Sequence, residues 1–317
     1  MDTIGIVFPG QGSQYVGMGR ELYEKFHGVR EVFDQAGEAL DIDIARLCFE
    51  GPQDALDLTP NTQAAVLTVD VALYRVFEEV VGVKPGVLAG HSLGEYAALC
   101  AAGAIDFSDA VRLVYARGQY QQEAVPPGEG CMAAVVGLDR GGVEEICRSV
   151  DTSCGVVDVA NDNSPGQFVI SGNTAAVEQA MARAREEGAR MVVKLPISVP
   201  CHCSLLDEAA QRLKHYLEGV AIRDCRVAVI PNFDPEALHS QETTKELLVR
   251  QLNAPVRWQE TVARMSRMGI RTAVEIGPKK TLSGLMRRID RGIKTLNIED
   301  KASLEATDDF FDGGEAA

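Results

Sequence analysis

The chain has 317 residues, of which 46% are hydrophobic and 24% are charged, and its formal net charge is −15. This length and composition predict a globular protein with one large domain, or with a large domain that carries a smaller inserted one. The acidity argues against a nucleic-acid partner, and no apolar run is long enough to span a bilayer, so we expect no membrane segment.

The N-terminal stretch MDTIGIVFPG has no basic region and no cleavage site. We therefore expect no signal peptide and a cytoplasmic protein. The eight cysteines include no CxxC pair, which fits a chain that stays reduced and forms no disulfides.

The first half of the chain alternates strand-like and helix-like stretches. An apolar strand ends at Pro9 and Gly10, and a second short apolar strand covers residues 86–90. Helical spacing of apolar residues starts at Gln63, and good helix formers fill residues 93–105 and the stretch after Phe107. Such alternation predicts a mainly parallel sheet with helices on both faces.

Residues 130–196 follow a different pattern. Strand-like and helix-like stretches occur there in the order β-α-β-β-α-β, which is the order of a ferredoxin-like fold. We expect this segment to be an inserted subdomain, after which the chain returns to the large domain.

Charge is unevenly distributed near the C-terminus. Residues 255–294 carry ten Lys or Arg and three acids, a net charge of +7 in an otherwise acidic chain. Residues 296–317 carry seven acids against one lysine, Lys301. We expect the last part, residues 301–317, to be a flexible acidic tail.

The motif Gly90-His91-Ser92-Leu93-Gly94 lies between a predicted strand and a predicted helix. This G-x-S-x-G context is typical of a nucleophilic serine on a sharp turn, with the following helix N-terminus available to an oxyanion. The alternative is a plain helix start with Ser92 as its N-cap, but an N-cap does not need flanking glycines.

A serine nucleophile needs a base, and His202 is the best candidate among five histidines. It follows an apolar strand and a proline, where a loop would present it to a site. We expect His91 to be a packing or turn residue, and His27, His215 and His239 to lie in polar, helical or surface surroundings. No acid stands out as a partner for His202, so we predict a Ser-His dyad whose imidazole is oriented by an amide or a carbonyl.

Eight motifs together resemble the malonyl-CoA:acyl carrier protein transacylase family, the acyltransferases of fatty acid and polyketide synthesis. They occur in the family's order over residues 3–297. They are FPGQGSQYVGMG (8–19), NTQAAVLT (61–68), GHSLGEYAAL (90–99), VYARGQYQQEA (114–124), NDNSPGQFVISG (161–172), SVPCHC (198–203), QLNAPVRWQE (251–260) and EIGPKKTLSGL (275–285).

The resemblance implies a role for each site residue. Ser92 would carry the acyl group and His202 would be its base. The N–H groups of Gln11 and Leu93 would form the oxyanion hole, and Gln251 would orient His202. Arg117 would bind the malonyl carboxylate, for which the fork of N–H donors on an arginine is suited.

The resemblance also implies a fold. We expect an α/β-hydrolase-like catalytic domain at residues 1–128 and 198–300, and a ferredoxin-like subdomain at residues 129–197.

The implied reaction transfers a malonyl group from malonyl-CoA to the phosphopantetheine thiol of acyl carrier protein through malonyl-Ser92, with no metal and no bound cofactor. Because carrier proteins are acidic, a basic docking face would be needed, and Lys279, Lys280, Arg287 and Arg288 would provide one. The alternatives are a polyketide-type acyltransferase with another extender unit, a serine thioesterase or carboxylesterase, and an inactive docking module.

Overall fold

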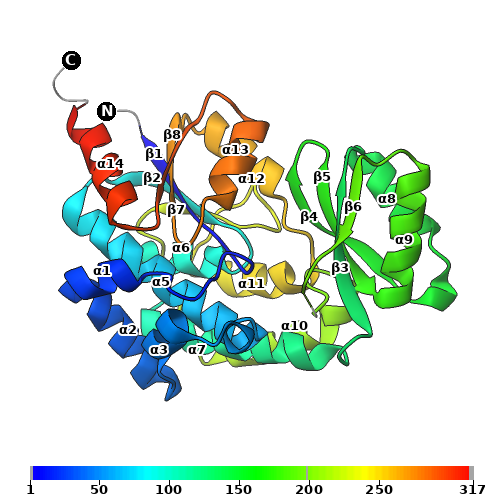
Figure 1. Cartoon of the computed structure of the whole chain (residues 1–317), viewed down its shortest axis with the longest axis horizontal. Helices are drawn as coiled ribbons and strands as arrows, with labels where there is room; N and C mark the ends of the chain where they lie inside the picture. Colours follow the sequence, from blue (N-terminus) through cyan, green and yellow to red (C-terminus); the bar gives the residue numbers. More distant parts are fainter. Residues whose placement is uncertain (1–2, 198, 314–317) are drawn as a thin grey trace.

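The computed structural model describes residues 3–197 and 199–313. A large unit contains a five-stranded sheet with strand order β7-β2-β1-β8-β9, and every adjacent pair of strands is parallel (Figure 1). The strands are β1 (Ile4–Phe8), β2 (Pro85–Gly90), β7 (Ala228–Ile230), β8 (Thr272–Ile276) and β9 (Lys294–Ile298). The mainly parallel sheet expected from the sequence is confirmed.

Helices cover both faces of this sheet because successive side chains of a strand point to opposite faces. Ile6 and Phe8 of β1 enter a core that also includes residues of α2, α5, α6, α7 and α10, whereas Val7 enters a second core with residues of α12 and α13. The helices of the large unit are α1 (Arg20–Lys25), α2 (His27–Leu40), α3 (Ile44–Glu50), α4 (Gln53–Leu56), α5 (Thr59–Val80), α6 (Gly94–Ala101), α7 (Phe107–Ala124), α10 (Asp207–Glu218), α11 (Thr244–Asn253), α12 (Trp258–Arg267), α13 (Thr281–Ile289) and α14 (Lys301–Asp312).

A small unit, residues 130–194, forms a four-stranded antiparallel sheet with strand order β4-β5-β3-β6. It consists of β3 (Gly130–Val136), α8 (Arg140–Ser149), β4 (Val157–Ser164), β5 (Gln167–Asn173), α9 (Thr174–Glu186) and β6 (Met191–Lys194). This is the expected ferredoxin-like order. The proposed domain boundaries at residues 128/129 and 197/198 stay a prediction.

The two units meet along β4 and the loop that follows β6. Asp162 donates its N–H to the carbonyl of Val256, and Val256 donates its N–H to the carbonyl of Ala160, so the β4 edge is paired with a segment of the large unit. The small unit therefore stands directly beside the carboxyl ends of the parallel strands (Figure 1).

The prediction of a flexible tail at residues 301–317 is wrong for most of that segment. Residues Lys301–Asp312 form the helix α14, which begins with a capping box between Asp300 and Ser303 and buries Leu304 and Thr307. A cap at its start and packing of one face on β9 stabilise the helix despite the acidic composition. Residues 314–317 lie outside the described part of the chain.

The eight cysteines are free. No helix of residues 3–197 and 199–313 is both long and apolar enough to cross a membrane.

Candidate active site

Ser92 lies on a sharp turn between β2 and α6, with a φ of 52° in the left-handed region. The flanking glycines are required by close approach of the main chain. A Cβ on Gly90 would overlap the main-chain carbon of Gly94, and a Cβ on Gly94 would overlap the carbonyl of Phe8. The predicted nucleophile turn is thus present, and the turn presents Oγ at the carboxyl end of the sheet.

His202 meets Ser92 across 110 positions of sequence. Its Nε2 lies 2.7 Å from Ser92 Oγ, and its Nδ1 lies 2.8 Å from the main-chain oxygen of Gln251. A carbonyl oxygen can only accept, so Nδ1 carries the hydrogen and Nε2 is free to take the proton of Ser92. Burial, and then the positive charge of Arg117, lower the pKa of His202 to about 3, so this base is neutral at neutral pH.

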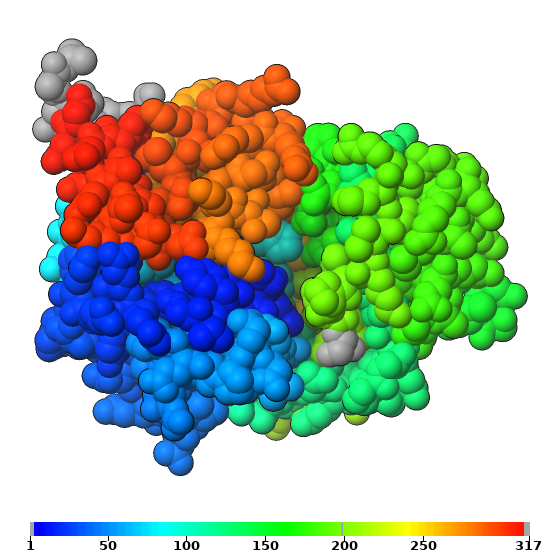
Figure 2. Space-filling model, viewed as in Figure 1, coloured from blue at the N-terminus to red at the C-terminus, as the bar shows by residue number. Residues whose placement is uncertain are grey.

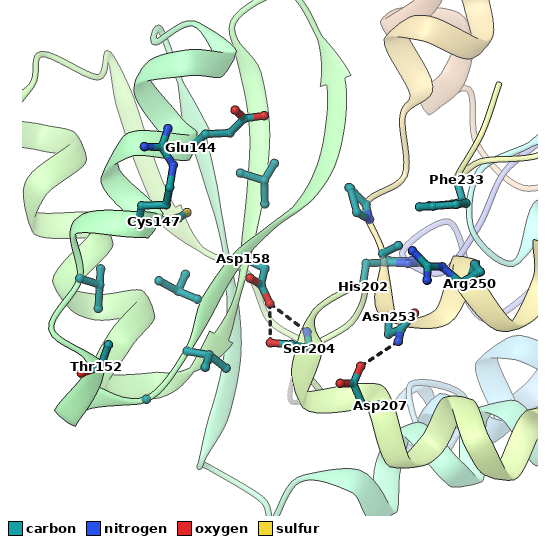
Figure 3. Close-up of a pocket in the computed structure, with 18 residues that line it drawn as sticks. Glu144, Cys147, Thr152, Asp158, His202, Ser204, Asp207, Phe233, Arg250 and Asn253 are labelled. Carbon is teal, nitrogen blue, oxygen red and sulfur yellow. Dashed lines mark hydrogen bonds between the residues drawn. The ribbon is translucent and has the colours of Figure 1, made fainter. Parts of the chain in front are cut away.

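The His202 loop is held by the small unit. Ser204 donates from both its N–H and its Oγ to Asp158 Oδ2 on β4, each at 2.8 Å (Figure 3). His202 itself has a φ of 59°, a strained conformation that the surrounding contacts maintain. The small unit therefore helps to place the base.

Arg117 of α7 is 1% exposed and lies beside the dyad. Its Nη2 donates to Ser92 Oγ at 3.1 Å and to Gln251 Oε1 at 3.0 Å, and its Nη1 donates to Gln63 Oε1 at 2.8 Å. These acceptors are neutral, and within the described residues Arg117 forms no ion pair. A buried cation with only neutral partners can bind an anionic group of a ligand.

Gln251 of α11 contacts His202, but through its main chain. Its side-chain amide instead accepts from Arg117 and donates from Nε2 to the carbonyl of Ser92 at 2.8 Å and to Glu95 Oε2 at 3.1 Å. The expected role as the orienting group thus belongs to the Gln251 carbonyl, and the side chain ties Arg117 to the Ser92 turn.

Gln11 and Leu93 offer two main-chain N–H groups near the serine. The loop that carries Gln11 packs directly on the turn, because a Cβ on Gly10 would overlap the carbonyl of His91 and lie 3.6 Å from the nitrogen of Leu93. Among the residues that the structure describes, neither N–H has a hydrogen-bond acceptor. Both are therefore free to stabilise an oxyanion.

Three residues of the site were missed by the sequence analysis. Asn232 follows β7, its Oδ1 accepts from the N–H of Ser92 at 2.6 Å, and its Nδ2 donates to the carbonyl of Gly90 at 2.6 Å. Glu95 and His239 lie beneath it and contact each other at 2.9 Å. The only available signal for Asn232 was its place after a short apolar strand, since polar residues at the carboxyl ends of parallel strands meet at one edge.

The expectation for the other histidines is partly wrong. His239 is buried, with 5% exposure, because it is bonded to Glu95 and Thr244. His27 and His215 are exposed as expected. His91 packs its ring on Trp258, with 5.7 Å between the ring centroids, and contacts Asn163 Oδ1 at 2.8 Å, as expected for a packing residue.

Two cavities lie at the site, one lined by His91, the neighbour of Ser92, and the other by His202. One, of about 220 Å³, is lined by the Gly10–Ser13 loop, by Asn161 and Asn163 of β4 and by α13. It corresponds to the hollow where the blue, orange and green segments meet in Figure 2. The other, of about 650 Å³, reaches His202 between β4 and α11 and is bordered by Phe233 and Arg250 (Figure 3).

Within residues 3–197 and 199–313, no three His, Cys, Asp or Glu side chains are grouped as metal ligands would be.

Both the sequence and the structure are similar to those of known acyltransferases. Residues 6–305 match the family model described as acyl transferase domain. The chain is 43% identical, over 96% of its own length and 96% of the other, to malonyl CoA-acyl carrier protein transacylase of Bacillus subtilis. The solved transacylase of Coxiella burnetii has a TM-score of 0.93 and 45% identity, with 96% of each chain covered. A malonyl-transacylase solved in complex with a type II PKS acyl-carrier protein has a TM-score of 0.94 and 42% identity, with 96% of this chain and 98% of that chain covered.

Proposed function

This chain belongs to the acyl transferase family, as a relative of the malonyl CoA-acyl carrier protein transacylases, and we propose that it transfers a malonyl group from malonyl-CoA to the thiol of an acyl carrier protein. The observation that carries the proposal is the position of Arg117. Its guanidinium is buried, has no carboxylate partner in the described part of the chain, and lies 3.1 Å from Ser92 Oγ. An acyl group on Ser92 that ends in a carboxylate would supply that partner.

The first half of the reaction acylates the serine. Ser92 Oγ attacks the thioester carbonyl while His202 Nε2 takes its proton, and the N–H groups of Gln11 and Leu93 bind the oxygen that becomes negative. When the carbon–sulfur bond breaks, His202 returns the proton to the departing CoA thiol. Malonyl-Ser92 remains, with its carboxylate on Arg117.

The second half repeats these steps in the reverse sense. The carrier thiol gives its proton to His202 Nε2 and attacks the malonyl ester, and the proton then returns to Ser92. Because one thioester replaces another, the thioester supplies the activation and the steps need neither metal nor cofactor. We further propose that the protein acts in the cytoplasm, where its eight cysteines would stay reduced.

Two features support transfer over the hydrolase alternative. The Nδ1 of His202 faces a main-chain carbonyl, whereas a triad esterase holds a carboxylate there. Arg117 also selects an acyl group with a free carboxylate, which an ordinary esterase does not require. We propose a carrier of fatty acid synthesis as the acceptor, and parallel assays with carriers of fatty acid and of polyketide synthesis test this choice.

We propose that the thioester arm enters through the cavity beside the Gly10–Ser13 loop, since the oxyanion donor Gln11 lines it. Basic residues adjoin this opening. Lys279 donates from Nζ to the carbonyl of Gly12 at 2.9 Å, and α13 carries Arg287 and Arg288 beyond its pocket-lining residues. An acidic carrier protein would dock there.

Intact-mass analysis after brief exposure to malonyl-CoA tests the function. We expect a malonyl adduct on the wild-type protein and none on Ser92→Ala, and an unlabelled wild type would refute the proposal. Charge reversal at Lys280 and Arg287 should raise the KM for carrier protein but leave labelling by malonyl-CoA intact. The same reversal at Arg185, an exposed residue of α9, is the matched control, and an unchanged KM in the Lys280 and Arg287 variants would exclude this docking face.

A further inference from the structure

A closed polar network lies directly beneath the Ser92 turn. The side chains of Glu95 on α6 and His239 after β7 are both 0% exposed, and Glu95 Oε1 lies 2.9 Å from His239 Nε2. The other oxygen, Oε2, accepts from the N–H of Asn232 at 2.8 Å and from Gln251 Nε2 at 3.1 Å. The proposed reaction mechanism uses neither Glu95 nor His239.

Hydrogen-bond counting assigns the protons of this pair. The hydroxyl of Thr244 donates its single hydrogen to the carbonyl of Ser240 at 2.7 Å, so it can only accept from His239 Nδ1 at 3.1 Å. Nδ1 therefore carries a hydrogen, and the 2.9 Å contact to Glu95 requires another on the shared side. The two donors to Glu95 Oε2, Asn232 and Gln251, favour the ionised form of the carboxyl, which places that hydrogen on His239 Nε2.

We propose that Glu95 and His239 form a buried ion pair that positions Asn232 and Gln251, and through them the peptide groups on both sides of Ser92. Asn232 holds the N–H of Ser92 at 2.6 Å, and Gln251 holds its carbonyl at 2.8 Å. The inference deepens the proposed function and rests on it, since it concerns the same acyl transfer.

The contact of Gln251 with Ser92 gives the pair its effect on catalysis. The carbonyl of Ser92 and the N–H of Leu93 belong to one planar peptide group. A donor that fixes the carbonyl therefore also fixes the direction of the N–H that is assigned to the oxyanion. Loss of the pair would leave the N–H of Glu95, at 3.1 Å, to hold the Ser92 carbonyl without Gln251. The peptide would then be less firmly oriented, and acylation by every thioester donor would slow.

The Glu95–His239 pair also determines whether a net negative charge acts on Arg117. Gln251 is bonded to Glu95 at one end of its amide and to Arg117 at the other. If His239 were uncharged, the negative charge of Glu95 would act on Arg117 through this amide and oppose a malonyl carboxylate. The positive charge of His239 removes that competition, so malonyl-CoA binding would depend on His239 and acetyl-CoA binding would not.

Replacing each member of the pair tests the inference. We expect His239→Leu to lower the kcat of Ser92 acylation at least tenfold with malonyl-CoA and acetyl-CoA alike, and to raise the KM for malonyl-CoA alone. Glu95→Ala should lower kcat similarly. Glu95→Gln should recover most of that loss, because its amide can accept from Asn232 and Gln251 and donate to a neutral His239. His215→Leu, at an exposed position of α10, is the matched control.

The double variant Glu95→Gln/His239→Leu should acylate faster than His239→Leu, because it has no unpaired buried charge. A double variant no faster than the single one, or a His239→Leu protein with wild-type kcat and KM, would overturn the inference. If the wild type is labelled by malonyl-CoA and these variants behave like it, the inference alone fails. An unlabelled wild type would instead refute the proposed function.

A spectroscopic measurement covers the case in which His239→Leu does not fold. In wild-type protein labelled with ¹⁵N-histidine, we expect both ring nitrogens of His239 to carry hydrogen near neutral pH, and only Nδ1 of His202 to carry one. Comparison with His239→Gln assigns the signals. A bare ring nitrogen on His239 would overturn the ion pair.

Discussion

Replacing Arg117 by alanine should remove the preference for malonyl-CoA. Nη2 of Arg117 lies 3.1 Å from Ser92 Oγ, so a malonyl group on that oxygen stays within reach of the guanidinium fork. Two hydrogen bonds to a charged acceptor contribute about 3–4 kcal/mol together. Because 1.4 kcal/mol corresponds to about a factor of ten, kcat/KM for malonyl-CoA should fall roughly 10²- to 10³-fold.

Acetyl-CoA has no carboxylate, so Arg117→Ala should change its kcat/KM by less than about tenfold, the effect of one lost contact to Oγ. Rates of adduct formation by intact-mass analysis, measured with each donor alone, give both values. Arg112→Ala is the matched control, because Arg112 lies on the same helix, is exposed and pairs with Asp109 at 2.9 Å. Equal losses with both donors, or malonyl labelling at the wild-type rate, would refute the assignment of Arg117.

Three further outcomes follow from the structure. Gly90→Ala should lower the free energy of unfolding by more than about 2 kcal/mol in urea titrations, since its methyl group would overlap Gly94. Gly284→Ala in α13 is the control and should be neutral or slightly stabilising, because an added Cβ there contacts nothing within 4 Å. The kcat/KM for acylation should stay constant from about pH 8 to 5, because His202, with a pKa of about 3, remains unprotonated over this range. A fall centred near pH 6.5 would show that His202 has the ordinary histidine pKa. Asp70 is fully buried with no partner for either oxygen in the described residues, and burial followed by the charge of Glu275 raises its pKa. The Asp70 carboxyl is therefore protonated in the folded protein but ionised in the unfolded chain above about pH 3.9, so the free energy of unfolding falls as the pH rises. Asp70→Asn should stabilise the fold by an amount that grows by about 1.4 kcal/mol per pH unit until the folded carboxyl ionises. Equal gains at pH 5 and 7 would contradict this.

The parts of the site that sequence could predict are those with a local or family pattern. The G-x-S-x-G turn is local, because its glycines are needed for contacts within a few residues and to the adjacent strand β1. His202 and Arg117 were found from motifs, and the structure brings both to Ser92. The small unit could be predicted because its six strand-like and helix-like stretches follow one another in the order β-α-β-β-α-β.

The other features of the site and fold depend on contacts between segments that are far apart in the sequence, and these contacts could not be predicted. Nothing around His239 in sequence indicates burial, because its partner Glu95 lies 144 positions earlier. The role of the Gln251 carbonyl could not be read from a residue type, since every residue has one. Composition was misleading for α14, where a cap and two buried side chains outweigh a run of acids.

The neutral carbonyl behind His202 makes the imidazolium short-lived. Because a carbonyl and not a carboxylate faces Nδ1, the charged ring formed during attack has little stabilisation, and it readily gives its proton away. Each half-reaction needs such a quick return, first to the sulfur of the departing CoA and then to Ser92 Oγ when malonyl-Ser92 is cleaved. The same hydrogen bond that orients the base therefore lets one ring serve two leaving groups of different basicity, a thiol and an alcohol.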